Sequence, residues 1–130
     1  MGRTSAAHYP VAVSTDPPGP SEAAPAHYFS ASPASPARER LISVMLAGSE
    51  VEVCTDSGVF SSGRLDLGTR VLLHKVPPPP AQGQLLDLGC GWGPLALTMA
   101  MLAPQARVWA VDVNERALGL VRANAAKLAK

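Results

Sequence analysis

Two acidic residues and three glycines follow apolar segments in the last third of the chain. The run LLDLGCGWGP, residues 85–94, contains Asp87 and then the three glycines Gly89, Gly91 and Gly93. Glycine has no side chain, so it accepts positive φ angles and lets a ligand approach the backbone closely. A second acid, Asp112, follows the apolar residues of RVWAVDV. These residues predict a site that binds a small molecule against a glycine-rich loop.

The acid in front of the glycines limits the charge of that molecule. Dinucleotide-binding loops have the pattern G-x-G-x-x-G and bring a pyrophosphate to a helix N-terminus. Here Pro94 stands where the third glycine should be, and Asp87 would repel a pyrophosphate. S-adenosylmethionine has an ammonium and a sulfonium group and no phosphate, so its charge suits Asp87. Asp112 is placed to accept hydrogen bonds from ribose hydroxyls. We therefore expect S-adenosylmethionine as the cofactor.

Alternating elements would position these residues. From residue 84 the expected order is strand, helix, strand, helix, at Gln84–Leu88, Pro94–Ala103, Arg107–Val113 and Glu115–Lys130. Asn114 is the expected N-cap of the second helix. This βαβα order with short links predicts the α/β class, with a parallel sheet and right-handed crossovers. Ligands of such sheets bind beyond the carboxyl ends of the strands, where Asp87 and Asp112 would meet.

Residues 38–76 are expected to form a helix and a hairpin that lead into this unit. Apolar residues of Arg38–Leu46 recur at i, i+1, i+4 and i+5, which predicts a short amphipathic helix. The segment EVEVCTDSGVF alternates apolar and polar residues and contains the turn residues DSG, which predicts a β-hairpin. A helix is expected over Thr69–Lys75. Residues 77–83 form a stiff, proline-rich connector.

Residues 1–37 are rich in Pro, Ala and Ser and lack sustained periodicity. Such a composition cannot offset the entropy of ordering, so this segment is predicted to be a disordered tail. The domain organisation expected for the 130 residues is therefore the tail at 1–37 and a partial domain at 38–130, whose βαβα unit spans 84–130.

Composition excludes several functional classes. The chain has 11 basic and 10 acidic residues, a formal net charge of +1, which counts against a strong nucleic-acid binder residing in this chain alone. Its two cysteines, Cys54 and Cys90, fit neither a disulfide framework nor a zinc site, and we expect no metal. The longest apolar stretch is too short to span a bilayer, so we expect no membrane contact and a cytoplasmic location.

The run LLDLGCGWGPLALTMA followed by VWAVDVNERAL resembles the first two motifs of class I S-adenosylmethionine-dependent methyltransferases. With GVFSSGRLDLGTRVLL and AVDVNERALGLVRANA, residues 59–130 resemble the small-domain type, typified by bacterial ribosomal RNA guanine-N2 methyltransferases. The resemblance implies a Rossmann-like fold with a seven-stranded, mostly parallel sheet and helices on both faces, of which this chain is the N-terminal part. It also implies N-methylation of guanine, with ribosomal RNA as the partner through a longer chain.

The resemblance also implies a set of cofactor-binding residues. Asp87 and the three glycines would hold the methionine end of the cofactor, and Asp112 its ribose. The LDLGT loop would cover the cofactor from the other side with Asp66, Gly68 and Thr69. Four neighbours complete the expected set: Cys90, Trp92, Val113 and Asn114. From the residues alone, Trp92 either lines the pocket or caps the helix, and packing is favoured over a nucleophilic role for Cys90.

The family's Asn-Pro-Pro-aromatic motif, which holds the amino nitrogen to be methylated, does not occur in the 130 residues. We expect a chain truncated before that motif, nominate no catalytic residue, and expect this chain alone to be inactive. Two other functions stay open. One is a non-catalytic cofactor-binding remnant or regulatory module, and the other is a methyltransferase that acts on a protein amide or a small molecule.

Overall fold

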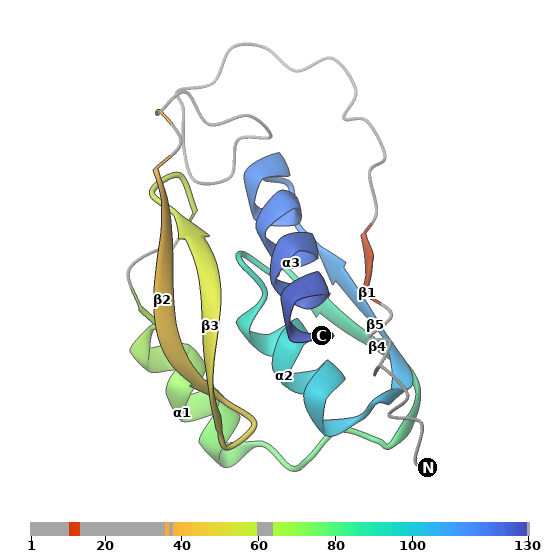
Figure 1. Ribbon diagram of the computed structural model, residues 1–130. Coiled ribbons are helices and arrows are strands. Elements are labelled where there is room, and N and C mark those ends of the chain that lie inside the picture. Colours follow the sequence, from red (N-terminus) through yellow and green to blue (C-terminus); the bar gives the residue numbers. More distant parts are fainter. Residues whose placement is uncertain (1–10, 14–35, 37, 60–63, 130) are drawn as a thin grey trace, which may run out of the picture.

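The computed structural model describes residues 11–13, 36, 38–59 and 64–129. In chain order the elements are β1 (Val11–Val13), β2 (Glu39–Leu46), β3 (Ser49–Asp56), α1 (Leu67–Lys75), β4 (Gln82–Leu88), α2 (Pro94–Leu102), β5 (Gln105–Val111) and α3 (Glu115–Leu128). Three layers result: the β2–β3 hairpin, then helices α2 and α3, then a sheet of β1, β5 and β4 (Figure 1). The α/β class predicted from the sequence is confirmed.

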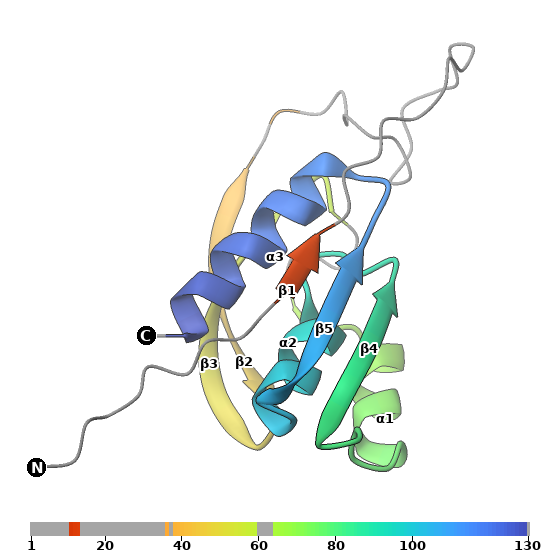
Figure 2. The same cartoon turned by 90° about the vertical axis from the view of Figure 1, so that its right-hand side faces the viewer.

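The three-stranded sheet has the order β1-β5-β4, and both of its pairings are parallel. Asp87 pairs in register with Ala110, so the carboxyl ends of β4 and β5 lie together as predicted. Figure 2 shows α2 and α3 behind this sheet, on one of its faces. On the other face Leu86 and Leu88 are 61% and 78% exposed. Among the described residues, helices thus cover one face of the sheet, whereas the resemblance implied helices on both.

Residues 39–46 form strand β2 and not the predicted amphipathic helix. Ile42, Val44 and Leu46 alternate with exposed residues and turn inward, which is the period of a strand. The hairpin predicted from EVEVCTDSGVF is therefore displaced: β3 pairs with β2, which precedes it, with Leu46 opposite Ser49. Ala47 and Gly48 both have positive φ, as the favoured two-residue hairpin turns require. The helix prediction failed because a short apolar run fits both periods and the pairing partner decides between them.

Strand β1 lies within residues 1–37, most of which are predicted to be disordered. Val11–Val13 pair in parallel with β5, with Val11 opposite Val108. The other edge of β5 is paired with β4, and a free strand edge presents unpaired N–H and C=O groups that a short extended segment can satisfy. This pairing is a tertiary effect that the composition of residues 1–37 does not reveal. Apart from β1 and Pro36, the predicted tail lies outside the described residues.

Helix α3 lies between two apolar clusters. The hairpin core, between the hairpin and the helices, consists of Val44, Leu46, Val53, Val59, Trp92, Leu97, Ala117, Leu120 and Ala125. The sheet core, between the helices and the sheet, consists of Cys90, Ala96, Ala100, Val108, Ala110, Leu118 and Val121. The two helices and the two strands predicted for the βαβα unit are confirmed within two residues at each end. Together they fix the loop between β4 and α2.

Candidate functional site

The loop between β4 and α2, residues 89–93, is fastened to the end of β5 by backbone hydrogen bonds. Gly89 N–H and Cys90 N–H both donate to the carbonyl of Val111, at 2.7 and 2.9 Å. Gly91 N–H donates to Oδ2 of Asp112 at 2.9 Å. The carboxyl ends of the two strands are thereby joined by the loop itself, and the glycines predicted to bind a ligand stand beside Asp112.

The three glycines meet different surroundings. All have positive φ, +78° at Gly89, +55° at Gly91 and +104° at Gly93. A Cβ added at Gly89 would have no atom within 4 Å, whereas one at Gly93 would lie 2.5 Å from Val121 Cγ2. The packing of the loop against α3 therefore explains why a glycine is needed at Gly93, whereas an added Cβ at Gly89 or Gly91 would not clash. The predicted contact of all three glycines with a ligand stays a prediction, because their spacing alone does not separate packing from binding.

Asp87 is buried at the end of β4 and supports the first turn of α2. Its Oδ2 accepts a hydrogen bond from Ala96 N–H at 2.9 Å. Burial raises the pKa of the Asp87 carboxyl, and the nearby charge of Asp112 raises it further, against the lowering effect of the Ala96 N–H. Ionisation of the Asp87 carboxyl group is thus less favourable here than in water.

Asp112 joins the glycine loop to helix α3. Its Oδ2 accepts from Gly91 N–H, and its Oδ1 accepts from Asn114 N–H at 2.8 Å. A carboxylate offers about four acceptor positions, so roughly two remain for a ligand. The side chain is half-buried, which keeps it within reach of one.

The carboxyl ends of β4 and β5 form a negative edge of the sheet, because Asp87 and Asp112 both lie there. Asp87 and Asp112 are close enough for the charge of one to affect the other, and both raise the pKa of Cys90. In the described part of the chain, Arg116 pairs with Asp56 and Lys127 with Glu52, and neither ion pair includes Asp87 or Asp112. A positively charged ligand group would therefore relieve the repulsion, and a phosphate would add to it.

The LDLGT residues form one capped helix turn. Asp66 is the N-cap of α1, accepting from Thr69 N–H at 3.0 Å and from Thr69 Oγ1 at 2.6 Å. The hydroxyl bond to Thr69 contributes most to lowering the pKa of Asp66. A Cβ on Gly68 would approach Asp66 Oδ2 to 3.2 Å, so the glycine suits the cap. The side-chain hydrogen bonds of Asp66 go to Thr69, and its carbonyl accepts from Arg70 N–H at 3.0 Å. The predicted role of the LDLGT residues over the cofactor stays a prediction.

Of the four neighbours in the expected set, Val113 is exposed and the others point inward. Trp92 is only 1% exposed and its indole belongs to the hairpin core, which favours packing over a pocket wall. Cys90 is buried in the sheet core, and burial raises the pKa of its thiol to about 12, so it is a weak nucleophile. Asn114 caps α3, as predicted, by accepting from Arg116 N–H at 3.0 Å.

Asn124 was not predicted as a functional residue, and it links α3 to β3 and to the loop between β4 and α2. From α3 its Oδ1 accepts from Cys54 N–H at 2.6 Å, and its Nδ2 donates to the carbonyls of Cys54 and Trp92 at 2.9 and 3.1 Å. The side chain is fully buried. The sequence contains one signal that could have identified Asn124: it is a polar residue on the apolar face of a predicted helix. A buried amide there must find hydrogen-bond partners.

The part of the chain that the structure describes contains no group of three or more acidic, histidine or cysteine residues that could hold a metal ion. Nor does it contain a helix long and apolar enough to cross a membrane.

Comparison with protein families and with curated proteins finds one matching family and several similar proteins. The family model described as "Methyltransferase small domain" matches residues 50–129. The "Uncharacterized protein YbxB" of Bacillus subtilis (strain 168) is 36% identical over 99 residues, which cover 76% of this chain and 49% of that protein. A "Ribosomal RNA small subunit methyltransferase C" of Shewanella baltica (strain OS155 / ATCC BAA-1091) is 42% identical over 69 residues, 53% of this chain and 19% of that protein. The chain thus spans about half the length of the first relative and about a fifth of the second.

A solved structure has the same fold over most of the chain. The 16S rRNA N2 G1207 methyltransferase (RsmC) of T. thermophilus, in complex with AdoMet and guanosine, matches with a TM-score of 0.59 and 28% sequence identity. The match covers 72% of this chain and 26% of that one.

Proposed function

This chain belongs to the methyltransferase small domain family, and from that membership we propose that it is the cofactor-binding part of an S-adenosylmethionine-dependent methyltransferase. The observation that carries the proposal is the negative edge formed by Asp87 and Asp112 beside a glycine with open space. S-adenosylmethionine supplies a methyl group bonded to a positively charged sulfur, and its ribose offers two hydroxyl donors.

The residues present fit this cofactor. Asp112 has acceptor positions left for ribose hydroxyls after binding Gly91 and Asn114. Gly89 lies where the loop surface is open, so the methionine end can approach the backbone. The buried charge of Asp87 compensates a cationic ligand through space while its Oδ2 stays bonded to Ala96 N–H.

The contribution of these residues to methyl transfer is positioning. The loop is held by two bonds to Val111 and one to Asp112, so contacts within the protein support its conformation. A site that holds its ligand in a fixed orientation lowers the entropic part of the barrier to a displacement reaction. We assign no proton transfer and no catalytic residue to the described part of the chain.

We propose an amino nitrogen of guanine in ribosomal RNA as the methyl acceptor of the whole protein. The support is the activity named for the relatives, which include a small-subunit ribosomal RNA methyltransferase and a methyltransferase structure with AdoMet and guanosine. With a net charge of +1, the chain offers little attraction for RNA by itself. We therefore propose that RNA recognition belongs to the whole protein and does not rest on the charge of these 130 residues.

Titration calorimetry of the 130-residue chain with S-adenosylmethionine, and separately with NAD⁺, tests the cofactor proposal. We expect S-adenosylmethionine to bind and NAD⁺ not to, because the two acids repel its pyrophosphate. Asp87→Asn keeps an oxygen for Ala96 N–H but removes the charge, and we expect weaker binding. Glu39→Gln removes an exposed charge on β2 and serves as the matched control, with unchanged affinity.

Two results would contradict the proposal. One is binding of NAD⁺ in preference to S-adenosylmethionine. The other is equal affinity for S-adenosylmethionine in the wild-type chain and in Asp87→Asn, which would show that the acid does not act on the ligand.

A further inference from the structure

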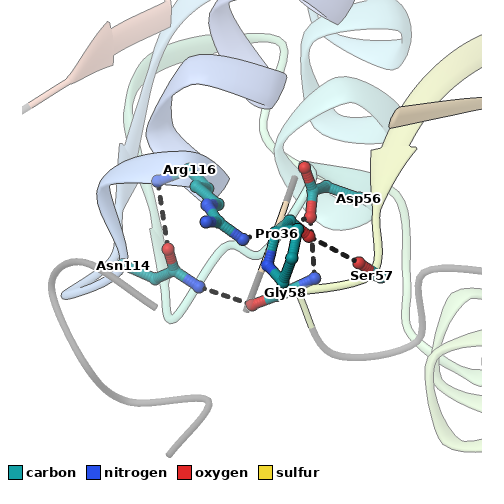
Figure 3. A network of polar contacts seen from close by, with 6 residues as sticks. All are labelled: Pro36, Asp56, Ser57, Gly58, Asn114 and Arg116. Atoms are coloured by element: carbon teal, nitrogen blue, oxygen red, sulfur yellow. Dashed lines mark hydrogen bonds and ion pairs between the residues drawn. The ribbon is translucent and has the colours of Figure 1, made fainter. Parts of the chain in front are cut away.

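The turn at the end of β3, residues 56–59, is held through the two backbone groups of Gly58, its N–H and its carbonyl (Figure 3). Gly58 N–H donates to Asp56 Oδ1 at 2.7 Å, and the carbonyl of Gly58 accepts from Asn114 Nδ2 at 2.9 Å. Gly58 is buried, so each of these backbone groups needs its partner. Asn114, a residue 56 positions further along the chain, thus helps to hold this turn, together with the bond from Val59 N–H to the Asp56 carbonyl.

Asn114 uses both ends of its side chain inside the protein. Its Oδ1 caps α3 through Arg116 N–H, while its Nδ2 binds the carbonyl of Gly58. The residue is 2% exposed. It was expected among the cofactor-binding residues, yet a buried side chain with both polar atoms occupied is poorly placed to contact a ligand directly. Any role of Asn114 in the neighbouring cofactor site would therefore be indirect.

An ion pair strengthens the same junction between β3 and α3. Arg116 Nη1 lies 3.7 Å from Asp56 Oδ1, and the Asp56 carboxylate is buried. Figure 3 shows both side chains directed at each other beside Gly58. Charged pairs that are shielded from water are less weakened by salt than exposed ones. The first turn of α3 thus holds the turn after β3 by charge as well as by hydrogen bonds.

The contacts close into a ring that includes the glycine loop. Gly91 N–H binds Asp112, and Asp112 also binds Asn114 N–H. Asn114 binds Gly58, and the next residue, Val59, is buried in the hairpin core together with Trp92, which follows Gly91 in the glycine loop. A displacement of the Gly58 carbonyl would therefore reach the glycine loop through Val59 and Trp92 on one side and through Asn114 and Asp112 on the other.

We infer that Asn114 is a positioning residue for the cofactor site: through the carbonyl of Gly58 it holds Val59 against the glycine loop and keeps Asp112 oriented for its ligand. The inference rests on the proposed function, since it concerns the same cofactor. It replaces the expected direct contact of Asn114 with an action through Gly58, Val59 and Asp112.

Equilibrium dialysis of the 130-residue chain with labelled S-adenosylmethionine tests the inference. Asn114→Asp keeps an oxygen to cap α3 but, when ionised, has no N–H for the Gly58 carbonyl. We expect its Kd to rise about tenfold, equivalent to one lost hydrogen bond. Asn114→Ser also caps the helix, adds no charge and is too short to reach Gly58, so it should show the same rise if Asn114→Asp does not fold.

Val44→Ala is the matched control, because it removes buried apolar atoms from the hairpin core without breaking a bond of the ring. We expect it to lower stability and leave Kd unchanged at a temperature where the chain is folded. In nitrogen-15 correlation spectra, the Gly91 amide signal should move in Asn114→Asp and not in Val44→Ala.

The outcomes separate the two proposals. If the wild-type chain does not bind S-adenosylmethionine, the proposed function fails and the inference fails with it. If the wild type binds and Asn114→Asp binds equally well, the proposed function stands and the inference is overturned. A rise in Kd that is as large in Val44→Ala also overturns it, because the effect would then be one of general stability.

Discussion

Replacing Gly93 by alanine should destabilise the fold far more than the same change at Gly89. Both glycines have positive φ, so an alanine at either position costs about 1–2 kcal/mol of backbone strain. The two positions differ in space: a Cβ at Gly89 meets nothing within 4 Å, while one at Gly93 meets Val121 and Leu97. The comparison therefore separates conformational strain from a packing clash inside one loop.

The packing clash at Gly93 cannot be relieved by one rotation. The added Cβ would lie 2.5 Å from Val121 Cγ2, but also 3.2 Å from Val121 Cβ and 3.3 Å from Leu97 Cγ. Turning the Val121 side chain moves Cγ2 and leaves Cβ in place. Overpacking of this kind costs about 1–3 kcal/mol. With the backbone strain, the free energy of unfolding should fall by about 2–5 kcal/mol in Gly93→Ala, against about 1–2 kcal/mol in Gly89→Ala.

Urea unfolding followed by far-ultraviolet circular dichroism measures both variants under the same conditions. The double variant Gly93→Ala with Val121→Ala provides a further check, because it removes the Cγ2 atom that clashes. The two substitutions should then cost less together than the sum of their separate costs. Equal destabilisation by Gly93→Ala and Gly89→Ala, or strict additivity in the double variant, would refute the packing explanation of Gly93.

Two further predictions concern Asp87 and α3. The pKa of Asp87 is raised above its ordinary value of 3.8, so ionisation destabilises the fold above the raised pKa and has no effect below about 3.8. Asp87→Asn should therefore unfold at higher urea than the wild type at pH 7, with the difference shrinking as the pH falls towards 4; a less stable variant at pH 7 would contradict this. Gly119 is exposed inside α3 with space for a Cβ, so Gly119→Ala should stabilise the chain by about 1 kcal/mol in the same assay, and no gain would argue against a regular helix there.

The βαβα unit could be predicted because its local signals agree with its tertiary environment. Pro94 stands in the first turn of α2 and Asn114 is the N-cap of α3, and both are local chemistry that the fold keeps. The meeting of Asp87 and Asp112 followed from the parallel strand order alone. For the segment 39–46, by contrast, local periodicity allowed two structures, and only the presence of β3 beside it selected the strand.

The roles of individual site residues were harder to predict, because they depend on contacts between distant parts of the chain. Gly93 meets Val121 and Asn124 meets Cys54, and no spacing rule within the loop or the helix encodes either contact. Trp92 stands inside the glycine loop, yet its indole packs with the hairpin. Residues that are adjacent in sequence therefore face different layers of the fold. A sequence motif predicts one shared role for them, whereas their roles in the structure differ.

The position of α3 between two cores limits how its sequence can vary. Ala117, Leu120 and Ala125 face the hairpin, while Leu118 and Val121 face the sheet. Most surface helices have a single constrained stripe and can exchange residues freely over the rest. Here the exposed positions include Lys127, which pairs with Glu52, so free exchange is confined to Gly119, Arg122, Ala123 and Ala126. A saturation library of this helix should therefore tolerate substitutions on one narrow strip, so engineered tags or labels on α3 belong there.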